Sequence, residues 1–560
     1  MVDQANGDPL SPKSPYPFRS VSTIMDVIIQ TNNDQYSVFG KDYFLSKYGF
    51  SPENVDEKLH LKIIQNDNNT YPDDRINGWV EWKGRRLPVL FPPDFLDERG
   101  TPLLSYTNGL VESPCAIITP DDIIISLDIF RHLGLFLSGY MEKTWALLKE
   151  GKKDIIMVPF SDYYCDFLMF CLHTIHNKQN IPLVYKSLWP DGKSFAVHLS
   201  HDVDELTKSY QWITHPWKYV KNYNSHGLYN QYLSFKQKLR GIEPYWTFEP
   251  LMRMEDELGV KSSFYFLKEK SKVLVANRTT WRHLGRRYDW DSPKVKAIMK
   301  KMDGGGWEVG LHGSFNSYND HEKIFSEKNA LEKALGASCI VGTRQHNLNL
   351  KIPETWIGHE KSGLLYDATL GYNDCMGFRW GTCLPFHPYI IEEKRILKLL
   401  EIPLIIEDLP FFRNNNRQED ALKIIQEVMN QHGILTLLWH HTVFNDNEYP
   451  GWGSAYKQII EYCKKKDSWV TTGKNIVEWW LQREISNFTW NFGGRILSII
   501  PSPIDVQHYF MVYIPKNLSF KSIKNAVIIQ LNEDFLSIKV KSIQPEERIE
   551  IEFDVTENRS

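Results

Sequence analysis

The chain has 560 residues, a formal net charge of −4 and 42% hydrophobic residues. These values are typical of a globular protein with several domains, and the slightly negative charge gives no reason to expect nucleic acid as the main partner. No stretch approaches the roughly 20 apolar residues of a membrane helix, and the first residues lack the apolar core of a secretion signal, so a cytoplasmic location is expected. Seven scattered cysteines without CxxC spacing argue against a disulfide framework and against a cysteine zinc site.

The first part of the chain shows no catalytic pattern. Residues 1–20 contain four prolines among mostly polar neighbours, which predicts a flexible tail. Residues 21–190 have a mixed pattern that predicts an N-terminal α/β domain packed against the rest of the protein. Within it, the apolar positions of residues 121–140 predict a helix.

An acidic motif follows the apolar stretch 195–199 and reads Ser200-His201-Asp202-Val203-Asp204. Side chains alternate along a strand with a period of two, so Ser200, Asp202 and Asp204 share one face. Two neighbouring carboxylates repel each other, and a divalent cation or a shared proton would compensate. One carboxylate could hold a metal while the other takes a proton from water. The alternative is an acidic loop in solvent, since acidic turns are common.

A long insertion, residues 206–248, separates this motif from the next predicted strand at 260–266. An insertion that leaves the carboxyl end of a barrel strand lies over the active-site face, which predicts a helical lid. Its aromatic and basic side chains would suit an anionic sugar, a phosphate-linked carrier or a membrane surface. The alternative is a packing or oligomer-contact element. The basic residues are Lys208, Lys218, Lys221, Lys236, Lys238 and Arg240.

Two further predicted strands end in histidines. A glycine turn and a short strand over 304–311 lead to His312, and Gly313 would let a ligand approach the backbone closely. The apolar stretch 433–439 ends in His440 and His441. A single histidine at a strand end is more often a core residue, but several polar strand ends in order are typical of a β/α barrel.

The remaining elements complete the predicted architecture. The apolar stretch 402–406 ends in Glu407 and Asp408, which could face the site, although a solvated loop is the favoured interpretation. Residues 486–560 carry alternating patterns that predict a small β-sandwich. Its expected strands cover residues 487–492, 510–515, 526–531 and 549–554.

The order of these motifs resembles a known superfamily. Asp202 with Asp204, His312, Arg344, the segment 374–381 and His440 follow one another as in the polysaccharide deacetylases of the NodB-homology type, carbohydrate esterase family four in the broad sense. The segments HDVD, GLHGS, RQH and GFR are most similar to an uncharacterised bacterial and archaeal branch. The resemblance covers about half of the chain. It implies a distorted (β/α)7 barrel over residues 191–485.

One position departs from the family pattern. The better-known enzymes carry a second histidine four residues after the first, and here that position is Asn316. An amide oxygen is a poorer zinc ligand than imidazole. Asn316 could complete a weaker site, His346 could replace the missing ligand, or the metal could be lost in a protein that only binds sugar. Replacement is the favoured explanation.

The resemblance implies metal-assisted amide hydrolysis. Zinc, with cobalt, nickel or manganese as alternatives, would be held by Asp204 and His312 together with a third ligand. Asp202 would act as general base and Arg344 would keep it ionised. His440 would protonate the leaving amine.

Further residues receive supporting roles from the same resemblance. Asp374 would hold the imidazole of His440. Arg379, Trp380, Trp439 and His441 would contact the substrate, although a structural ion pair is an equal alternative for Arg379 and His441 has the opposite strand parity. The expected activity is N-deacetylation of a carbohydrate or glycoconjugate. The rivals are hydrolysis of another carbon–nitrogen bond, such as a cyclic amide, and a catalytically silent glycan-binding protein.

Overall fold

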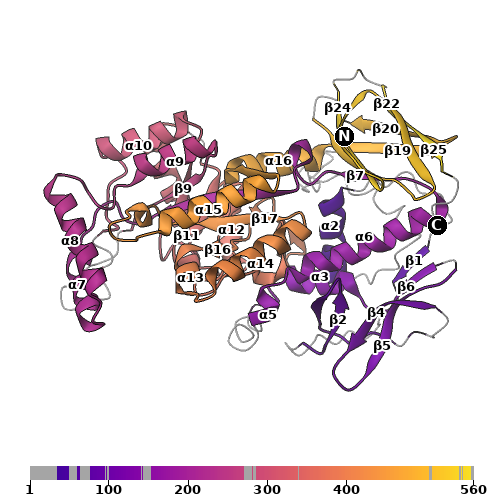
Figure 1. The fold of residues 1–560 in the computed structure, drawn as a ribbon, viewed down its shortest axis with the longest axis horizontal. Helices are drawn as coiled ribbons and strands as arrows, with labels where there is room; N and C mark the ends of the chain where they lie inside the picture. The colour runs from indigo at the N-terminus through magenta and orange to yellow at the C-terminus, as the bar shows by residue number, and fades with distance from the viewer. Residues whose placement is uncertain are drawn as a thin grey trace, which may run out of the picture.

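The computed structural model describes residues 34–49, 60–63, 76–94, 96, 100–120, 122–140, 142, 153–269, 281, 285–337, 340–502, 507–541, 544 and 547–556. The tail expected over residues 1–20 lies outside them. Figure 1 shows an elongated molecule in which a parallel sheet with its helices occupies one half, and the N-terminal and C-terminal strands occupy the other.

In the described residues, the N-terminal region contains a mixed sheet and four helices. The strand order is β1-β6-β5-β4-β2-β3. The helix expected over residues 121–140 begins only at Ile129, because Asp128 caps it by accepting a hydrogen bond from the backbone of Arg131 (3.0 Å) and the preceding residues form β6. The elements are β1 His60–Ile63, β2 Gly78–Trp82, β3 Arg85–Val89, β4 Thr101–Thr107, β5 Glu112–Ile118, β6 Asp122–Ile125, α2 Gln35–Tyr48, α3 Ile129–Leu137, α5 Lys153–Ile156 and α6 Phe160–Gln179.

A curled parallel sheet positions the residues of the predicted site. This sheet and its helices confirm the expected mixed α/β fold. Its strand order is β15-β12-β11-β10-β9-β8-β17-β16, with β18 also paired to β8. Every residue of β8, β9, β10 and β11 is buried, as expected of parallel strands covered on both faces. The strands are β8 Phe195–Val203, β9 Ser263–Leu267, β10 Glu308–Gly313, β11 Gly342–Gln345, β12 Tyr366–Asp367, β15 Leu400–Glu401, β16 Ile406–Glu407, β17 Ile434–Leu438 and β18 Ser468–Thr471.

The two ends of this strand order belong to one extended stretch of chain. The backbone N–H of Ile402 donates to Asp367 O of β12 (2.8 Å), and that of Ile405 donates to Thr436 O of β17 (3.3 Å). The stretch that contains β15 and β16 therefore lies between β12 and β17, which explains why the sheet curls.

Helices surround the parallel sheet (Figure 1). The insertion is helical, as expected, and forms α7 and α8. Both helices project from one end of the molecule. A short antiparallel pair, β13 Tyr389–Ile390 and β14 Arg395–Ile396, lies outside the main sheet. The helices are α7 Gln211–Lys221, α8 Ser225–Leu239, α9 Phe248–Leu258, α10 Pro293–Gly304, α11 His321–Leu335, α12 Glu354–Lys361, α13 Asp408–Arg413, α14 Arg417–Asn430, α15 Trp452–Lys465 and α16 Gly473–Ile485.

The C-terminal region contains two four-stranded antiparallel sheets, ordered β19-β20-β25-β22 and β23-β24-β21-β7. All four strands expected there are present. The rings of Phe488 in β19 and Phe510 in β21 lie 4.7 Å apart, so the sheets contact each other. The second sheet is completed by β7 Leu183–Lys186, which precedes the parallel sheet in the chain. The other strands are β19 Asn487–Gly493, β20 Ile496–Ser502, β21 Tyr509–Tyr513, β22 Leu518–Lys524, β23 Ala526–Leu531, β24 Phe535–Val540 and β25 Ile549–Val555.

Among the helices in the described part of the chain, none combines the length and the apolar character needed to cross a bilayer.

Candidate active site and metal centre

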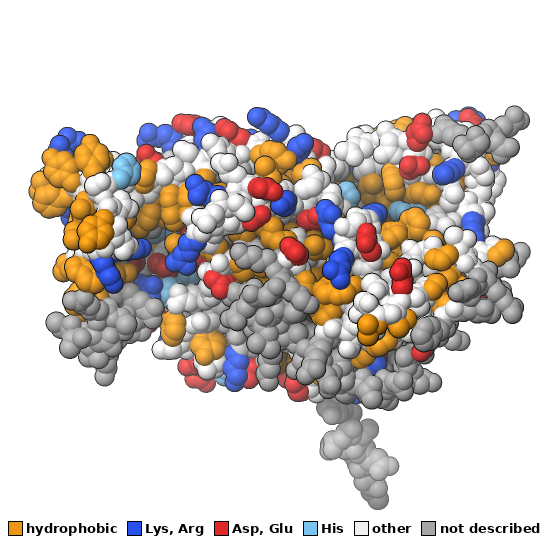
Figure 2. All heavy atoms as spheres, turned by 60° about the horizontal axis from the view of Figure 1, so that its bottom comes forward, with side chains coloured by type: hydrophobic (Ala, Val, Ile, Leu, Met, Phe, Trp, Pro, Cys, Tyr) orange, Lys and Arg blue, Asp and Glu red, His pale blue; other side chains and the backbone are white. Residues whose placement is uncertain are grey.

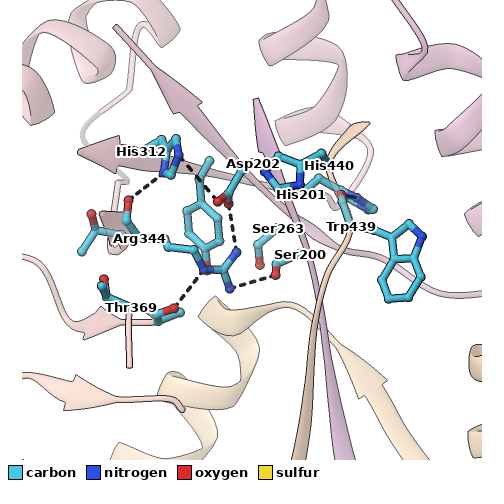
Figure 3. A network of polar contacts seen from close by, with 12 residues as sticks. Ser200, His201, Asp202, Ser263, His312, Arg344, Thr369, Trp439 and His440 are labelled. Atoms are coloured by element: carbon cyan, nitrogen blue, oxygen red, sulfur yellow. Dashed lines mark hydrogen bonds and ion pairs between the residues drawn. The ribbon is translucent and has the colours of Figure 1, made fainter. Parts of the chain in front are cut away.

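The carboxyl ends of the parallel strands bring the predicted polar residues together. Asp202 lies in β8 and Asp204 directly follows it, with both side chains on one face as the strand period predicts. His312 of β10 lies opposite Arg344 of β11 in the strand register. His440 follows β17, which pairs with β8 on its other side. Figure 3 shows Asp202 between Arg344 and His312, with His440 nearby.

Three candidate ligand atoms form a nearly equilateral triangle. Asp204 Oδ1 lies 3.2 Å from His312 Nε2 and 3.2 Å from His346 Nδ1, and the two ring nitrogens are 3.2 Å apart. Tetrahedral zinc with ligand bonds of about 2.0–2.1 Å holds its ligand atoms about 3.3 Å from one another. The triangle therefore has the dimensions of one face of a tetrahedral metal site.

The ring orientation of His312 and the surroundings of Asp204 also suit a cation. His312 Nδ1 lies 2.8 Å from Arg344 O, and because a carbonyl only accepts, Nδ1 carries a proton and Nε2 is the ring nitrogen available to a cation. Burial lowers the pKa of His312, but Asp202 and Asp204 outweigh burial and raise it, so a cation would displace the proton on Nε2. Asp204 Oδ1 is buried without a hydrogen-bond partner. Burial raises the pKa of the Asp204 carboxyl, but His346 and His312 outweigh burial and hold that pKa well below its ordinary value. The donor set therefore fits a divalent metal.

Asn316 lies apart from these atoms. Its side chain is exposed and lines a cavity together with Trp290, Lys323 and Glu327. Since His346 occupies the third corner of the triangle, the geometry favours His346 over Asn316 as the replacement ligand.

Asp202 is held by a buried guanidinium. Arg344 Nη1 donates to Asp202 Oδ1 (2.9 Å), Nη2 donates to Ser200 Oγ (2.9 Å), and Nε donates to Ala368 O (2.9 Å). Burial raises the pKa of Asp202, but the charges of His312 and Arg344 outweigh burial and leave the pKa below its ordinary value. Asp202 is therefore a carboxylate at neutral pH, and its Oδ2 lies 3.6 Å from His312 Nε2.

His440 is oriented by Asp408. Its Nδ1 lies 3.1 Å from Asp408 Oδ1, and its backbone N–H donates to Asp408 Oδ2 (2.7 Å). Burial lowers the pKa of His440, but Asp408, Asp204 and Asp202 together raise it well above its ordinary value. The imidazole is therefore a proton donor, with Nε2 lying 4.0 Å from Asp204 Oδ2.

Two predictions about carboxylates near His440 are wrong. Asp374 is exposed, and the carboxylate that holds His440 is Asp408. The favoured interpretation of Glu407 and Asp408 as a solvated loop also fails, because Asp408 is fully buried at the start of α13. The sequence did carry a signal for Asp408, since an apolar strand that ends in acidic residues can place a carboxylate at the site.

Glu407, Asp408 and His440 form a second group with potential ligand atoms within 4.8 Å of one another. Burial raises the pKa of Glu407 to about 8, so its carboxyl is mostly protonated at neutral pH. A protonated carboxyl is a poor cation ligand. The group around Asp204 is therefore the better candidate metal centre.

Trp380 and Arg379 contact the protein itself. Trp380 is 1% exposed and its Nε1 donates to Glu142 Oε2 (2.6 Å). Arg379 forms an ion pair with Glu142 and donates to Gly371 O (2.9 Å). The prediction that Trp380 binds substrate is wrong because no ring face is accessible, and Arg379 has the structural ion pair that was its alternative.

Trp439 and His441 are also core residues. Trp439 is fully buried and donates to Trp452 O (3.1 Å). His441 is fully buried and stacks on Phe248, with ring centroids 4.7 Å apart. Neither side chain presents a surface to a sugar, so the prediction that they bind substrate is wrong.

Arg286 was not predicted by any motif. It is 8% exposed, and its Nε and Nη1 atoms are buried without hydrogen-bond partners. Its charge helps to lower the pKa of Asp204 and of His346. Only tertiary structure brings it near the metal candidates.

Comparisons with known proteins gave similarity to solved structures alone. No family model and no curated protein matches the chain. A structure described as a polysaccharide deacetylase from Mycobacterium smegmatis is 19% identical, with a TM-score of 0.34, over 53% of this chain and 93% of that one. The Puue allantoinase is 13% identical, with a TM-score of 0.34 and the same two coverages. A structure described as a polysaccharide deacetylase from Pseudomonas aeruginosa is 14% identical, with a TM-score of 0.33. Scores this low support no assignment of function.

Proposed function

We propose that the protein is a metal-dependent carbohydrate N-deacetylase, a member of the polysaccharide deacetylase superfamily that its motif order resembles. The observation that carries the proposal is the triangle of Asp204, His312 and His346, with ligand atoms 3.2 Å apart, next to a separate carboxylate, Asp202. Zinc is the proposed metal because a carboxylate and two imidazoles suit its coordination.

Each surrounding residue then has a role. A zinc ion bound there would polarise the acyl oxygen of the substrate and lower the pKa of bound water to about 7. Asp202 takes a proton from the attacking water, and Arg344 holds that carboxylate in place. His440 donates a proton to the leaving amine, while Asp408 orients its ring.

The same proposal includes a finer fold assignment. A distorted seven-stranded barrel is supported by the single extended stretch that pairs with both β12 and β17. A C-terminal β-sandwich is supported by the contact between Phe488 and Phe510. The proposed domains cover residues 21–190, 191–485 and 486–560, with β7 of the first joining a sheet of the third.

The decisive experiment combines metal analysis with product analysis. Protein purified without chelators should contain about one zinc per chain by mass spectrometry. It should release acetate from N-acetylated oligosaccharides, lose activity with a chelator and regain it with zinc. Ring opening of cyclic amides without acetate release would indicate the rival hydrolase. Absence of metal, with no gain on adding zinc, cobalt or nickel, would indicate a silent glycan-binding protein.

A further inference from the structure

Helix α8 is amphipathic in the reverse sense to a normal surface helix. Its buried residues are polar or small, namely Gly227, Asn230, Gln231 and Ser234. Four of its large apolar side chains, Leu228, Tyr232, Phe235 and Leu239, lie at spacings of four, three and four residues, which places them on one helix face. That face is exposed to solvent, with accessible fractions of 36% for Leu228, 52% for Tyr232, 50% for Phe235 and 71% for Leu239.

Helix α7 and the turn that follows it continue the same surface. Ile213, Trp217 and Val220 are 64%, 58% and 60% exposed, and only Gln211 of this helix is buried. Tyr223 in the turn is 96% exposed. Figure 2 shows apolar side chains gathered at the end of the molecule where Figure 1 places α7 and α8. We call the set the hairpin face: Ile213, Trp217, Val220, Tyr223, Leu228, Tyr232, Phe235 and Leu239.

Specific polar contacts fix this orientation. Lys208 Nζ donates to Gln231 Oε1 (2.7 Å) and forms a buried ion pair with Glu448. Ser234 Oγ donates to Glu448 Oε1 (2.6 Å). The polar side of α8 is therefore bound to the rest of the protein, and the hairpin face must point outward. Monomeric soluble proteins rarely expose an apolar patch of this kind without a partner.

The charge around the hairpin face identifies the partner. Residues 206–242 contain no acidic side chain. Lys221 lies over the ring of Trp217 (5.6 Å) and Lys236 over that of Tyr232 (5.1 Å). Helices that lie in a bilayer interface combine aromatic and aliphatic side chains with lysine and arginine in this way. Further exposed cations are Lys218 and Arg240.

We propose that the hairpin face binds the surface of a bilayer that contains anionic phospholipid. A second copy of the chain fits the face less well, because a symmetric contact would set these cations against one another. The base of the hairpin contacts the loop after β17, where Asn445 Nδ2 donates to Gln237 Oε1 (3.1 Å). The hairpin is thus joined to the loop that follows the site residue His440. The inference does not depend on the reaction proposed above.

The test is co-sedimentation of the full chain with vesicles. We expect binding to vesicles of phosphatidylserine and phosphatidylcholine, and weaker binding as salt is raised. Vesicles of phosphatidylcholine alone should bind much less protein. The triple variant Lys218→Gln/Lys221→Gln/Lys236→Gln should bind the anionic vesicles about a hundredfold more weakly, at about fivefold per lysine. Trp217→Ser/Phe235→Ser should bind at least about tenfold more weakly.

The control replaces an exposed apolar residue and an exposed lysine elsewhere, Leu110→Ser/Lys516→Gln, and should bind as the native chain does. All variants change exposed side chains, so equal thermal unfolding will show that the fold is kept. The proposal fails if the native chain does not bind anionic vesicles, or if the hairpin variants bind equally well. It also fails if light scattering shows a dimer that Trp217→Ser/Phe235→Ser dissociates while vesicles bind nothing.

Discussion

Asp202 and Asp204 are two residues apart on one strand face, yet their neighbours give them different chemistry. Asp204 has a buried oxygen without a hydrogen bond, and two imidazole nitrogens lie 3.2 Å from it. Asp202 instead accepts a charged hydrogen bond from Arg344. One carboxylate is thus free to bind a cation, and the other stays ionised beside it.

The first prediction separates these two roles. Asp202→Asn should keep about one zinc per chain, because Asp202 lies outside the ligand triangle, and turnover should fall by about 10²- to 10⁴-fold. Zinc content and acetate release measured on the same preparation check this. Loss of the metal would show that the roles of the two aspartates are exchanged.

The second prediction concerns the third ligand. His346→Ala should weaken zinc binding at least about tenfold, because it removes one corner of the triangle. Asn316→Ala is the matched control and should leave the affinity unchanged, since that side chain is exposed in another cavity. Competition titration with a zinc chelator measures both. Equal affinities for the native chain and His346→Ala would rule out His346 as a ligand.

From the sequence, the site residues at the ends of strands were predicted correctly more often than the residues expected to contact the substrate. Asp202, Asp204, His312, Arg344 and His440 converge because strand pattern and parity are local properties. By contrast, the sequence does not show where the chain turns after a strand, so Trp380, Trp439 and His441 were expected at a surface and lie in the core. Arg286 reaches the site through tertiary packing alone. Asp408 follows the apolar strand β16, but the sequence alone could not distinguish a buried carboxylate there from a solvated loop.

At the scale of elements, the hairpin of α7 and α8 depends on one buried ion pair. Lys208 and Glu448 have side chains that are 0% and 1% exposed, and they join the hairpin to the loop before α15. Burial raises the pKa of Glu448, but His215 and Lys208 outweigh burial and lower the pKa to about 2. Glu448 therefore stays ionised at neutral pH, and its contact with Lys208 positions the hairpin.

The third prediction tests this anchor. Glu448→Gln should destabilise the hairpin by about 3–5 kcal/mol, because it leaves the charge of Lys208 buried without a counter-charge. Hydrogen exchange in α7 and α8 should accelerate, while exchange in β8 and β9 stays slow.

The matched control is Lys238→Gln, which breaks the partly exposed ion pair with Glu243 and should cost less than about 1 kcal/mol. Unchanged exchange in the hairpin of Glu448→Gln would show that the buried pair is not its anchor.

Strands were predicted well and their partners were not. The alternating patterns at 487–492 and 549–554 identify β19 and β25, since the period of a strand is readable from a few residues. The assignment of β7 to a C-terminal sheet could not be predicted, because a pairing so distant in sequence leaves no local signal. Strand β6 could not be predicted either, because its residues also fit a helical pattern.

At the scale of the whole molecule, buried neutral histidines couple stability to pH. Burial lowers the pKa of His132, His176 and His441 to about 4. In the case of His132, the backbone N–H of Leu90 donates to Nε2 (2.9 Å), and Nδ1 lies 2.7 Å from the carbonyl of Asp128. The neutral tautomer with its proton on Nδ1 satisfies both contacts. Protonation of Nε2 would break the hydrogen bond from Leu90.

The fourth prediction follows from the direction of these shifts. The folded pKa values lie below the value near 6.5 of the unfolded chain, so the unfolded state binds more protons as the pH falls. The stability from these groups is complete above about pH 6.5 and is lost as the pH falls towards 4. The Tm measured by calorimetry should therefore fall less between pH 6.5 and 4.5 in His132→Gln than in the native chain, because the variant lacks one of these groups. His226→Gln, at an exposed position, should keep the native profile, and an equal fall of Tm in His132→Gln and the native chain would contradict the prediction.

The pairing of β7 with β21 has a consequence for synthesis on the ribosome. Strand β7 is translated before the whole parallel sheet, whereas its partner β21 is translated only after every strand of that sheet. Until then β7 offers unpaired backbone groups that a strand of another chain could bind. A nascent chain halted before residue 509 should therefore be the form most prone to aggregate or to recruit chaperones.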